Sequence, residues 1–427
     1  MEKPSTLTSA TLTSGQTMAK KSGAALLFTV TSALVLSLLA PATAANLDDG
    51  YPKDTAAPGR TCPMADEGFK TVSDYSGKTL VCTMINGTKR WWIEGDPLPE
   101  APSGGTNPGT GTGTNPGTGT FPGTVVVPDI QITHTYFLPA TSLAKMKVSE
   151  NVIYASQSPN QRLDLYMPKG VVKPPLVVWT HGGGFVFGDE DIMKYDEAAK
   201  LLEVFIKNGM AVASVNYRLA QEAPFPAAGV DTKRAIRFLR ANASKYGYDP
   251  KRFATGGDSA GGYLALMAAV TGDKSSPFDD ATDPNRKTSA AVSVVMDVFG
   301  NVDFFEMAEN NVKYPCDQSK NPWPVPTGNI HPWFGDITDP KVQATMKTGG
   351  LYPYIKSSKA LPAFYIFHGL DDCSVSPYDS KNLDKAVKAR KGQSTLALIP
   401  GAIHGGAGVF NAIMKAIPAI KKSLMKA

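Results

Sequence analysis

The stretch RFATGGDSAGGYLALMAAVTG, residues 252–272, indicates the fold class more directly than any other part of the sequence. It begins with RFATGGD, a short and largely apolar run typical of a buried strand, and it continues into GGYLALMAAVTG, an apolar helical run that ends at a glycine. Between the two lies Gly257–Gly261, a G-x-S-x-G pattern. A turn this sharp needs small neighbours and leaves the hydroxyl of Ser259 exposed at the N-terminus of the helix. The stretch therefore predicts a strand–turn–helix unit with Ser259 as the nucleophile.

Another strand-like run is followed by three glycines, in VVWTHGGGFVFGD at residues 177–189. The simplest interpretation of such a cluster is a flexible loop. The alternative is that the fold needs backbone groups there, because acyl transfer forms an oxyanion that requires preorganised N–H donors. We therefore expect Gly183 and Gly184 to donate, with the amide of Ala260 as a third donor. His181 precedes these donors, so we expect it to shape the loop by hydrogen bonds rather than to act as the base.

A serine nucleophile needs a base, and the chain has five histidines. His404 lies in IPGAIHGGAG, after the last predicted strand, where the order serine, acid, histidine of a hydrolase fold places the base. The acid should come from the loop HGLDDCSVSP, in which Asp371 and Asp372 both qualify by position. Neighbouring residues of an extended loop point in opposite directions, so only one of the two should meet His404.

Short apolar runs alternate with helical patterns after residue 174. Several of the runs are almost continuously apolar, as in strands buried on both faces of a parallel sheet. We expect an α/β fold with a mostly parallel central sheet and helices on both faces. The earlier runs VVVPDIQITHTYF (125–137) and RLDLYMP (162–168) are expected to form an antiparallel leading edge.

The sequence divides into four predicted parts. Residues 1–45 resemble a signal peptide, residues 46–100 form a small β-rich module, residues 101–124 form a linker, and residues 125–427 form the catalytic domain. The linker contains GTNPGTGT twice in succession and has almost no apolar side chain to bury.

The first part supports an exported protein without a stable membrane anchor. Lys20 and Lys21 precede an apolar run at 24–40, which is followed by the small-x-small site Ala42-Thr43-Ala44. An uncleaved anchor is the alternative, because the run is near the lower limit of length for a membrane span. The long region before the run leaves the true start open between Met1 and Met18.

The small module contains a hairpin signal at Asn86-Gly87, between two β-favouring runs. Trp91 and Trp92 follow it and suit either a surface-binding site or a small core. Four cysteines in an exported chain predict two disulfides, and pairing on each side of the linker is simplest. The predicted bonds are Cys62–Cys82 and Cys316–Cys373.

Residues from about 148 to 425 resemble bacterial α/β-hydrolases of the hormone-sensitive-lipase-like group, and most closely secreted feruloyl or acetyl esterases. The matching segments are HGGGF (181–185), VNYRLAQEAPFPAAGVDTKRAIRFLRANASKYGYDPKRFATGGDSAGG (215–262), HGLDDCSV (368–375) and GAIHGG (401–406). The acid of that family occupies the fifth position of an H-G-x-x-D pattern, which implies Asp372 rather than Asp371. One departure is Gln221, where relatives often have proline.

The resemblance implies a secreted serine carboxylesterase that needs no metal or organic cofactor. Its substrate would be an ester, in plant polysaccharide or in another polymer, and a short-chain lipase or a polyester hydrolase is the alternative within the class. A non-catalytic binding protein is the alternative from another class. The net charge of +5 is modest and forms no basic run, so we expect no nucleic-acid partner.

Specificity is expected from an insertion at residues 299–353, which is longer than a sheet connection needs. An aromatic wall over Ser259 would suit an aryl or extended acyl chain. The alternative is that these aromatic residues only pack the insertion onto the sheet. The expected pocket residues are Phe185, Trp323, Trp333 and Phe334.

Overall fold

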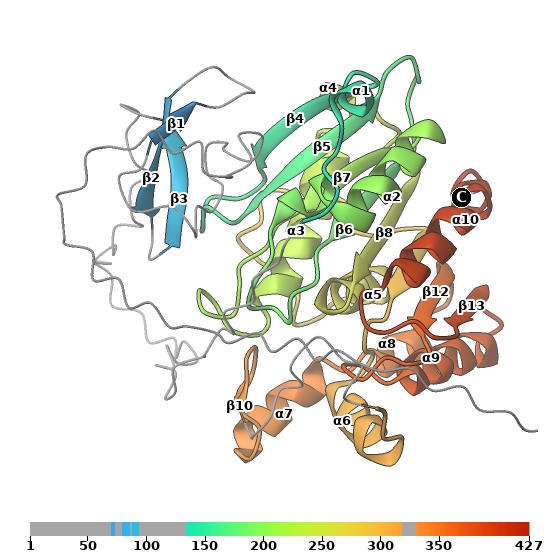
Figure 1. Ribbon diagram of the computed structural model, residues 1–427. Coiled ribbons are helices and arrows are strands. Elements are labelled where there is room, and N and C mark those ends of the chain that lie inside the picture. Colours follow the sequence, from blue (N-terminus) through green and yellow to red (C-terminus); the bar gives the residue numbers. More distant parts are fainter. Residues whose placement is uncertain (1–69, 73–78, 86–87, 94–133, 318–329, 427) are drawn as a thin grey trace, which may run out of the picture. The chain divides into compact units, whose positions relative to one another are not determined.

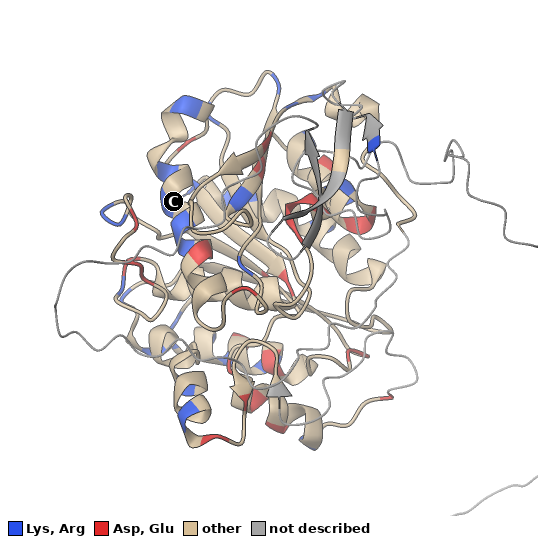
Figure 2. Cartoon of the chain, turned by 90° about the vertical axis from the view of Figure 1, so that its left-hand side faces the viewer, with Lys and Arg blue, Asp and Glu red and all other residues tan. Residues whose placement is uncertain are grey.

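The structure is a computed structural model that describes residues 70–72, 79–85, 88–93, 134–317 and 330–426 (Figure 1). The predicted signal peptide, the linker, Cys62 and Trp323 lie outside the described residues. Within these ranges, no helix combines the length and hydrophobicity that a membrane span requires. Figure 2 shows acidic and basic residues interspersed over the described elements.

The small module contains a three-stranded sheet of β1 (Lys70–Val72), β2 (Thr79–Ile85) and β3 (Thr88–Ile93). β2 pairs antiparallel with both neighbours, and its register places Cys82 opposite Trp91 in β3. The two β-favouring runs on either side of Asn86-Gly87 are therefore paired strands, as the hairpin signal predicts.

Residues 146–399 contain an eight-stranded sheet of order β13-β12-β9-β8-β6-β7-β5-β4 (Figure 1). β4 and β5 pair antiparallel, β5 and β7 pair antiparallel, and the remaining neighbours are parallel. This confirms the predicted α/β class with a mostly parallel sheet. The strands are β4 (Met146–Ile153), β5 (Arg162–Pro168), β6 (Leu176–Thr180), β7 (Ala211–Val215), β8 (Phe253–Asp258), β9 (Val294–Val298), β12 (Ala363–Gly369) and β13 (Ser394–Ile399).

The central strands are apolar throughout because helices cover both faces of the sheet. All residues of β6, β7 and β9 are buried. On one face, α2 (Asp196–Lys207) and α10 (Ala407–Leu424) contribute side chains such as Phe205 and Ile413 to a core with β6 and β9. On the other face, α3 (Ala227–Ala241), α5 (Ala260–Thr271) and α9 (Pro377–Ala389) form the larger core.

The antiparallel edge differs from the prediction in the identity of one strand. The partner of β5 is β4, whereas residues 134–137 of the predicted strand at 125–137 contain only an isolated bridge from Phe137 to Tyr195, and residues 125–133 lie outside the described ranges. The register of β4 shifts between Ser149 and Val152, and Asn151 there has φ 53°. This irregularity interrupts the two-residue period by which a strand is recognised.

Short elements complete the chain around the sheet. These elements are α1 (Ala140–Leu143), the 3-10 helix η2 (Glu190–Lys194), α4 (Ala243–Tyr246), α6 (Phe304–Lys313), β10 (Ile330–His331), β11 (Gly335–Asp336), α7 (Pro340–Thr348) and α8 (Tyr352–Ser357). The predicted insertion contains α6, β10, β11, α7 and the start of α8, and its residues 318–329 lie outside the described ranges.

Candidate active site

Ser259 lies on the turn between β8 and α5, in the strained conformation that the motif predicts. Its φ of 52° and ψ of −119° place it in a region that residues with a side chain rarely adopt. A Cβ on Gly257 would lie 2.3 Å from the carbonyl oxygen of Gly261, and a Cβ on Gly261 would lie 2.1 Å from the oxygen of Thr180. The two glycines therefore permit the sharp turn that holds the Ser259 hydroxyl at the end of the sheet.

His404 connects Ser259 to the acid loop, which we define as residues 370–376 between β12 and α9. Its Nε2 lies 3.0 Å from Ser259 Oγ, and its Nδ1 lies 2.7 Å from Asp372 Oδ2. The Phe299 ring lies 4.5 Å from the imidazole, between ring centroids. With Nδ1–H donated to the carboxylate, Nε2 can accept the serine proton, so the three groups form a chain suited to activating a nucleophile.

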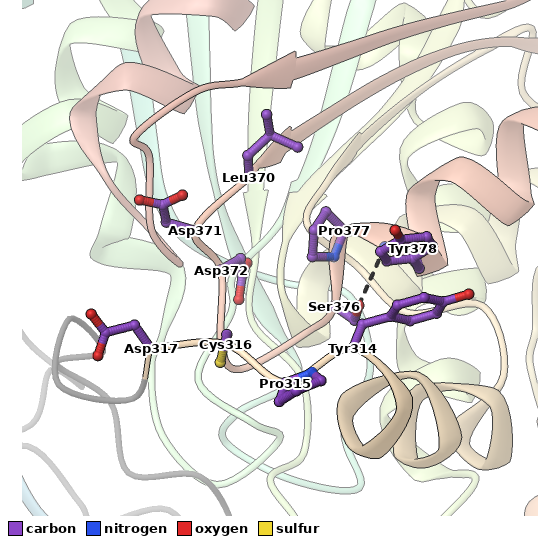
Figure 3. A pocket seen from close by; sticks show the side chains of 10 residues that line it. All are labelled: Tyr314, Pro315, Cys316, Asp317, Leu370, Asp371, Asp372, Ser376, Pro377 and Tyr378. Carbon is purple, nitrogen blue, oxygen red and sulfur yellow. Dashed lines mark hydrogen bonds between the residues drawn. The ribbon is translucent and has the colours of Figure 1, made fainter.

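Asp372, not Asp371, meets His404. Figure 3 shows the two carboxylates diverging on the acid loop, and Asp372 is only 2% exposed. Its other oxygen, Oδ1, accepts the backbone N–H groups of Ser374 and Val375 at 2.8 and 3.0 Å. Burial alone would raise the pKa of Asp372, but the charge of His404 and the hydrogen bonds it receives hold it well below its usual range. The acid is therefore an anion over the working range of the site.

A second imidazole, which the sequence did not single out, contacts the same carboxylate. His368 is fully buried at the end of β12, and its Nε2 lies 3.2 Å from Asp372 Oδ2. The i, i+4 spacing of histidine and aspartate in H-G-x-x-D is the only sequence signal for this contact. The spacing does not show which way the His368 ring points, so the contact between His368 and Asp372 could not be predicted from the sequence.

The glycine loop, residues 181–185, has the backbone geometry that the sequence suggested. Gly183 has φ 99°, and a Cβ there would lie 2.1 Å from the carbonyl oxygen of Phe187, so no other residue fits. Within the described ranges, the N–H groups of Gly183, Gly184 and Ala260 take part in no hydrogen bond. They are thus available as donors for an oxyanion.

His181 supports the glycine loop instead of acting as a base. Its Nδ1 lies 2.8 Å from the carbonyl oxygen of Gly182 and its Nε2 lies 3.2 Å from Asn216 Oδ1. The Tyr217 ring stacks on it at 4.2 Å between centroids. Burial lowers the pKa of His181 to about 4, which keeps the ring neutral.

The aromatic residues expected to form a wall over Ser259 are packed in the core instead. Phe185 and Trp333 stack at 4.1 Å between centroids, and Trp333 lies 5.4 Å from Phe334. Trp333 is 0% exposed, and the other two rings are also buried. Large rings bury the most apolar area when they pack on one another, and here they join the insertion to the glycine loop. The packing of these three rings therefore matches the alternative that the sequence left open, in which they attach the insertion to the rest of the fold.

The insertion is attached to the acid loop by a disulfide between Cys316 and Cys373, the pairing expected from the sequence. The side-chain amide of Asn311 adds two hydrogen bonds, donating to Ser374 O at 3.2 Å and accepting from the N–H of Ser376 at 3.1 Å. A pocket of about 200 Å³ beside this attachment is lined by the residues drawn in Figure 3, which include Asp372 but neither Ser259 nor His404. Among the described residues, no group of His, Cys, Asp and Glu could hold a metal ion.

Known proteins resemble this chain over the same region. Esterase LipC of Mycobacterium tuberculosis is 27% identical over 258 residues, which are 60% of this chain and 59% of that protein. Carboxylesterase NlhH of the same organism is 36% identical over 142 residues, or 33% of this chain and 43% of that protein. The chain thus spans about half the length of these curated relatives.

A solved structure described as a truncated form of a carbohydrate esterase from gut microbiota is 27% identical, with a TM-score of 0.53. The match covers 65% of this chain and 96% of that one. The sequence profile of the BD-FAE family matches residues 163–387, just over half of the chain, and this range includes Ser259, His368 and Asp372. The chain therefore belongs to the BD-FAE family of α/β-hydrolases.

Proposed function

We propose that this protein is a carboxylic ester hydrolase that uses Ser259 as its nucleophile. The observation that carries the proposal is the continuous chain from Ser259 Oγ through His404 to Asp372, with distances of 3.0 and 2.7 Å. The names of the relatives, among them an esterase and a carboxylesterase, support the same class of reaction.

The reaction proceeds in two steps that use the same groups. Ser259 Oγ attacks the ester carbonyl while His404 Nε2 takes its proton, and the N–H groups of Gly183, Gly184 and Ala260 stabilise the oxyanion. Collapse of this intermediate breaks the ester bond, and His404 delivers the proton to the leaving alcohol. Water then attacks the acyl-enzyme with His404 again as base, which releases the acid and restores Ser259. Asp372 keeps the imidazole in the required tautomer.

The substrate we propose is an ester on a polysaccharide or another polymer outside the cytoplasm. The apolar run at 24–40 after Lys20 and Lys21 supports export, and the glycine-rich linker supports a catalytic domain tethered to a separate module. The similar solved structure is described as a carbohydrate esterase, which supports a carbohydrate ester. Short-chain triglycerides and polyesters are the alternative substrates within the same chemistry.

Covalent labelling tests the nucleophile directly. A fluorophosphonate probe should attach to the protein with one equivalent per chain, and peptide mass spectrometry should find the adduct on Ser259. Ser276 is a matched surface serine that should carry no label, because its hydroxyl contacts Asp279 rather than a histidine. Labelling of another serine, with Ser259 unmodified, would overturn the assignment. A panel of acetyl, feruloyl, triglyceride and polyester substrates then ranks the substrate classes.

A further inference from the structure

The acid loop holds a second histidine that the reaction scheme does not use. We propose that His368 is a positioning residue: it donates a hydrogen bond to Asp372 Oδ2, fixes this oxygen in front of His404 and shares its negative charge. The inference rests on the proposed function, because it assigns a role toward the triad acid. The proposed role affects the rate of hydrolysis and its dependence on pH. The identity of the nucleophile does not depend on this role.

The surroundings of His368 determine where its proton lies. Nε2 faces two oxygen acceptors, the carbonyl of Val375 at 2.9 Å and Asp372 Oδ2 at 3.2 Å. Neither oxygen can donate, so Nε2 must carry the hydrogen, which it donates to the Val375 carbonyl with Asp372 Oδ2 as a second, longer contact. Nδ1 lies 2.7 Å from Ser380 Oγ, whose hydroxyl can donate to it. Both ring nitrogens are thus satisfied in one neutral tautomer, with Nε2–H bonded to Val375 and 3.2 Å separating Nε2 from Asp372 Oδ2.

His368 completes the set of donors around the carboxylate. Asp372 Oδ1 accepts two backbone N–H groups of its own loop, and Oδ2 lies within reach of two imidazoles, His404 at 2.7 Å and His368 at 3.2 Å. The backbone donors hold only Oδ1, so the carboxylate could still rotate about Oδ1 and move Oδ2. The second imidazole removes this freedom, because Oδ2 must then lie between the two rings. A fixed acceptor keeps His404 oriented toward Ser259.

His368 is anchored by elements other than the acid loop, which makes it a rigid support. It belongs to β12, and its Ser380 partner belongs to α9. Both side chains are fully buried, so their positions are set by the packed core and not by the loop. The contact with the His368 ring therefore fixes the position of Asp372 relative to the central sheet.

Other charged groups face the pair of imidazoles and must be considered in any pH response. Asp297 of β9 and Asp379 of α9 lie near His368, and burial raises the pKa of each to about 7. Glu306 of α6 interacts with Asp379, and Asp258 next to the nucleophile interacts with His404. Burial lowers the pKa of His368. The hydrogen bond and the charge of Asp372 raise this pKa by more than burial lowers it, so the net shift is upward.

Removal of the second donor has a defined consequence. Without His368, the charge of Asp372 acts on His404 alone and favours its protonated form, which cannot accept the serine proton. The rate of the variant therefore falls below that of the wild type most strongly at low pH. In addition, the less constrained carboxylate lowers kcat at every pH. Substrate binding does not involve this contact, so KM should change little.

The test compares His368→Leu with His368→Gln, whose side-chain amide can still donate at the position of Nε2. We expect His368→Leu to lower kcat about 30-fold with KM within about twofold, and to move the acid limb of the pH profile upward by about half a unit. His368→Gln should restore kcat to within about threefold of the wild type. His134→Gln is the control, because it removes a histidine–aspartate contact of 2.7 Å, to Asp196, outside the site.

Each outcome separates the proposals. If His368→Leu and His368→Gln lose activity equally, in step with their stability and with an unshifted pH profile, His368 is only a packing residue and the inference fails. If His368→Leu does not fold, Ser380→Ala replaces it, because loss of the Nδ1 partner should still lower kcat and shift the same limb; an unchanged profile would overturn the inference. Activity that persists in Ser259→Ala would instead overturn the proposed function.

Discussion

At the scale of single residues, the two neighbouring carboxylates of the acid loop give a matched test of the acid. Asp372→Asn should lower kcat by about three to four orders of magnitude, because an amide no longer selects the tautomer of His404 that accepts the serine proton. Asp371→Asn is the control and should retain most of the activity, since its side chain diverges from that of Asp372 (Figure 3). Steady-state kinetics on a soluble ester measures both variants. The reverse order of activities would place the acid at Asp371.

Sequence motifs were sufficient for some residues of the site and not for others. Ser259 and the glycines around it could be predicted, because the sharp turn leaves no space for a side chain at Gly257 and Gly261. This steric requirement appears in the sequence as glycine at both positions. The contact of His368 could not be predicted, because its direction depends on the Ser380 hydroxyl, supplied by another element. The burial of the aromatic residues of the insertion could not be predicted either, because it depends on three-dimensional packing that spacing does not encode.

At the scale of elements, the N-terminus of α9 carries a buried carboxyl whose titration should affect stability. Burial raises the pKa of Asp379 to about 7. Between about pH 4 and pH 7 the folded protein keeps this proton while the unfolded chain releases it, so the free energy of unfolding falls as the pH rises through this window. Asp379→Asn removes the effect. Between pH 5 and pH 8, the free energy of unfolding of Asp379→Asn should therefore rise by about 2.6 kcal/mol relative to that of the wild type.

Urea unfolding of both proteins at the two pH values measures this difference, and the comparison cancels every group that the two chains share. Asp372 has the opposite sign, because a depressed pKa contributes stability above the unfolded value and loses it only in acid. A constant difference between Asp379→Asn and the wild type from pH 5 to pH 8 would show that Asp379 titrates normally.

The disulfide joins the segment after α6 to the acid loop and closes a sequence separation of 57 residues. Replacing Cys316 and Cys373 together by serine should lower the free energy of unfolding by up to about 4 kcal/mol in the chain-entropy model. Asn311 still holds the loop by two hydrogen bonds, so kcat should fall by less than about tenfold. Denaturant unfolding and a soluble-ester assay check the two effects. Unchanged stability would mean that the bond constrains neither state.

The burial of each strand of the large sheet decides whether the strand could be predicted from the sequence. β6, β7 and β9 are apolar at almost every position because both faces are covered, and each was recognised as a continuous run. β4 was missed because its register shifts between Ser149 and Val152, which breaks the alternation of a half-buried strand. Its pairing with β5 is set by the tertiary fold rather than by local pattern.

At the scale of the whole molecule, we propose that the small β-rich module serves delivery rather than chemistry. Residues 46–120 contain no histidine, and the catalytic groups all belong to the other part of the chain. Tethering through the linker raises the local concentration of the catalytic domain at a surface without changing the site. Removal of residues 46–120 should leave turnover of a soluble ester within about twofold and lower product release from an insoluble polymer. Loss of soluble turnover in a folded truncation would make the module part of the site.

The proposed esterase activity of the whole chain depends on one serine. Hydrolysis of p-nitrophenyl acetate by the wild type and by Ser259→Ala measures this dependence, with Ser276→Ala as a matched control outside the site. Because the nucleophile is removed, we expect a loss of at least about four orders of magnitude in kcat for Ser259→Ala, with Ser276→Ala close to the wild type. Equal turnover by the wild type and Ser259→Ala would contradict the role of Ser259 as nucleophile.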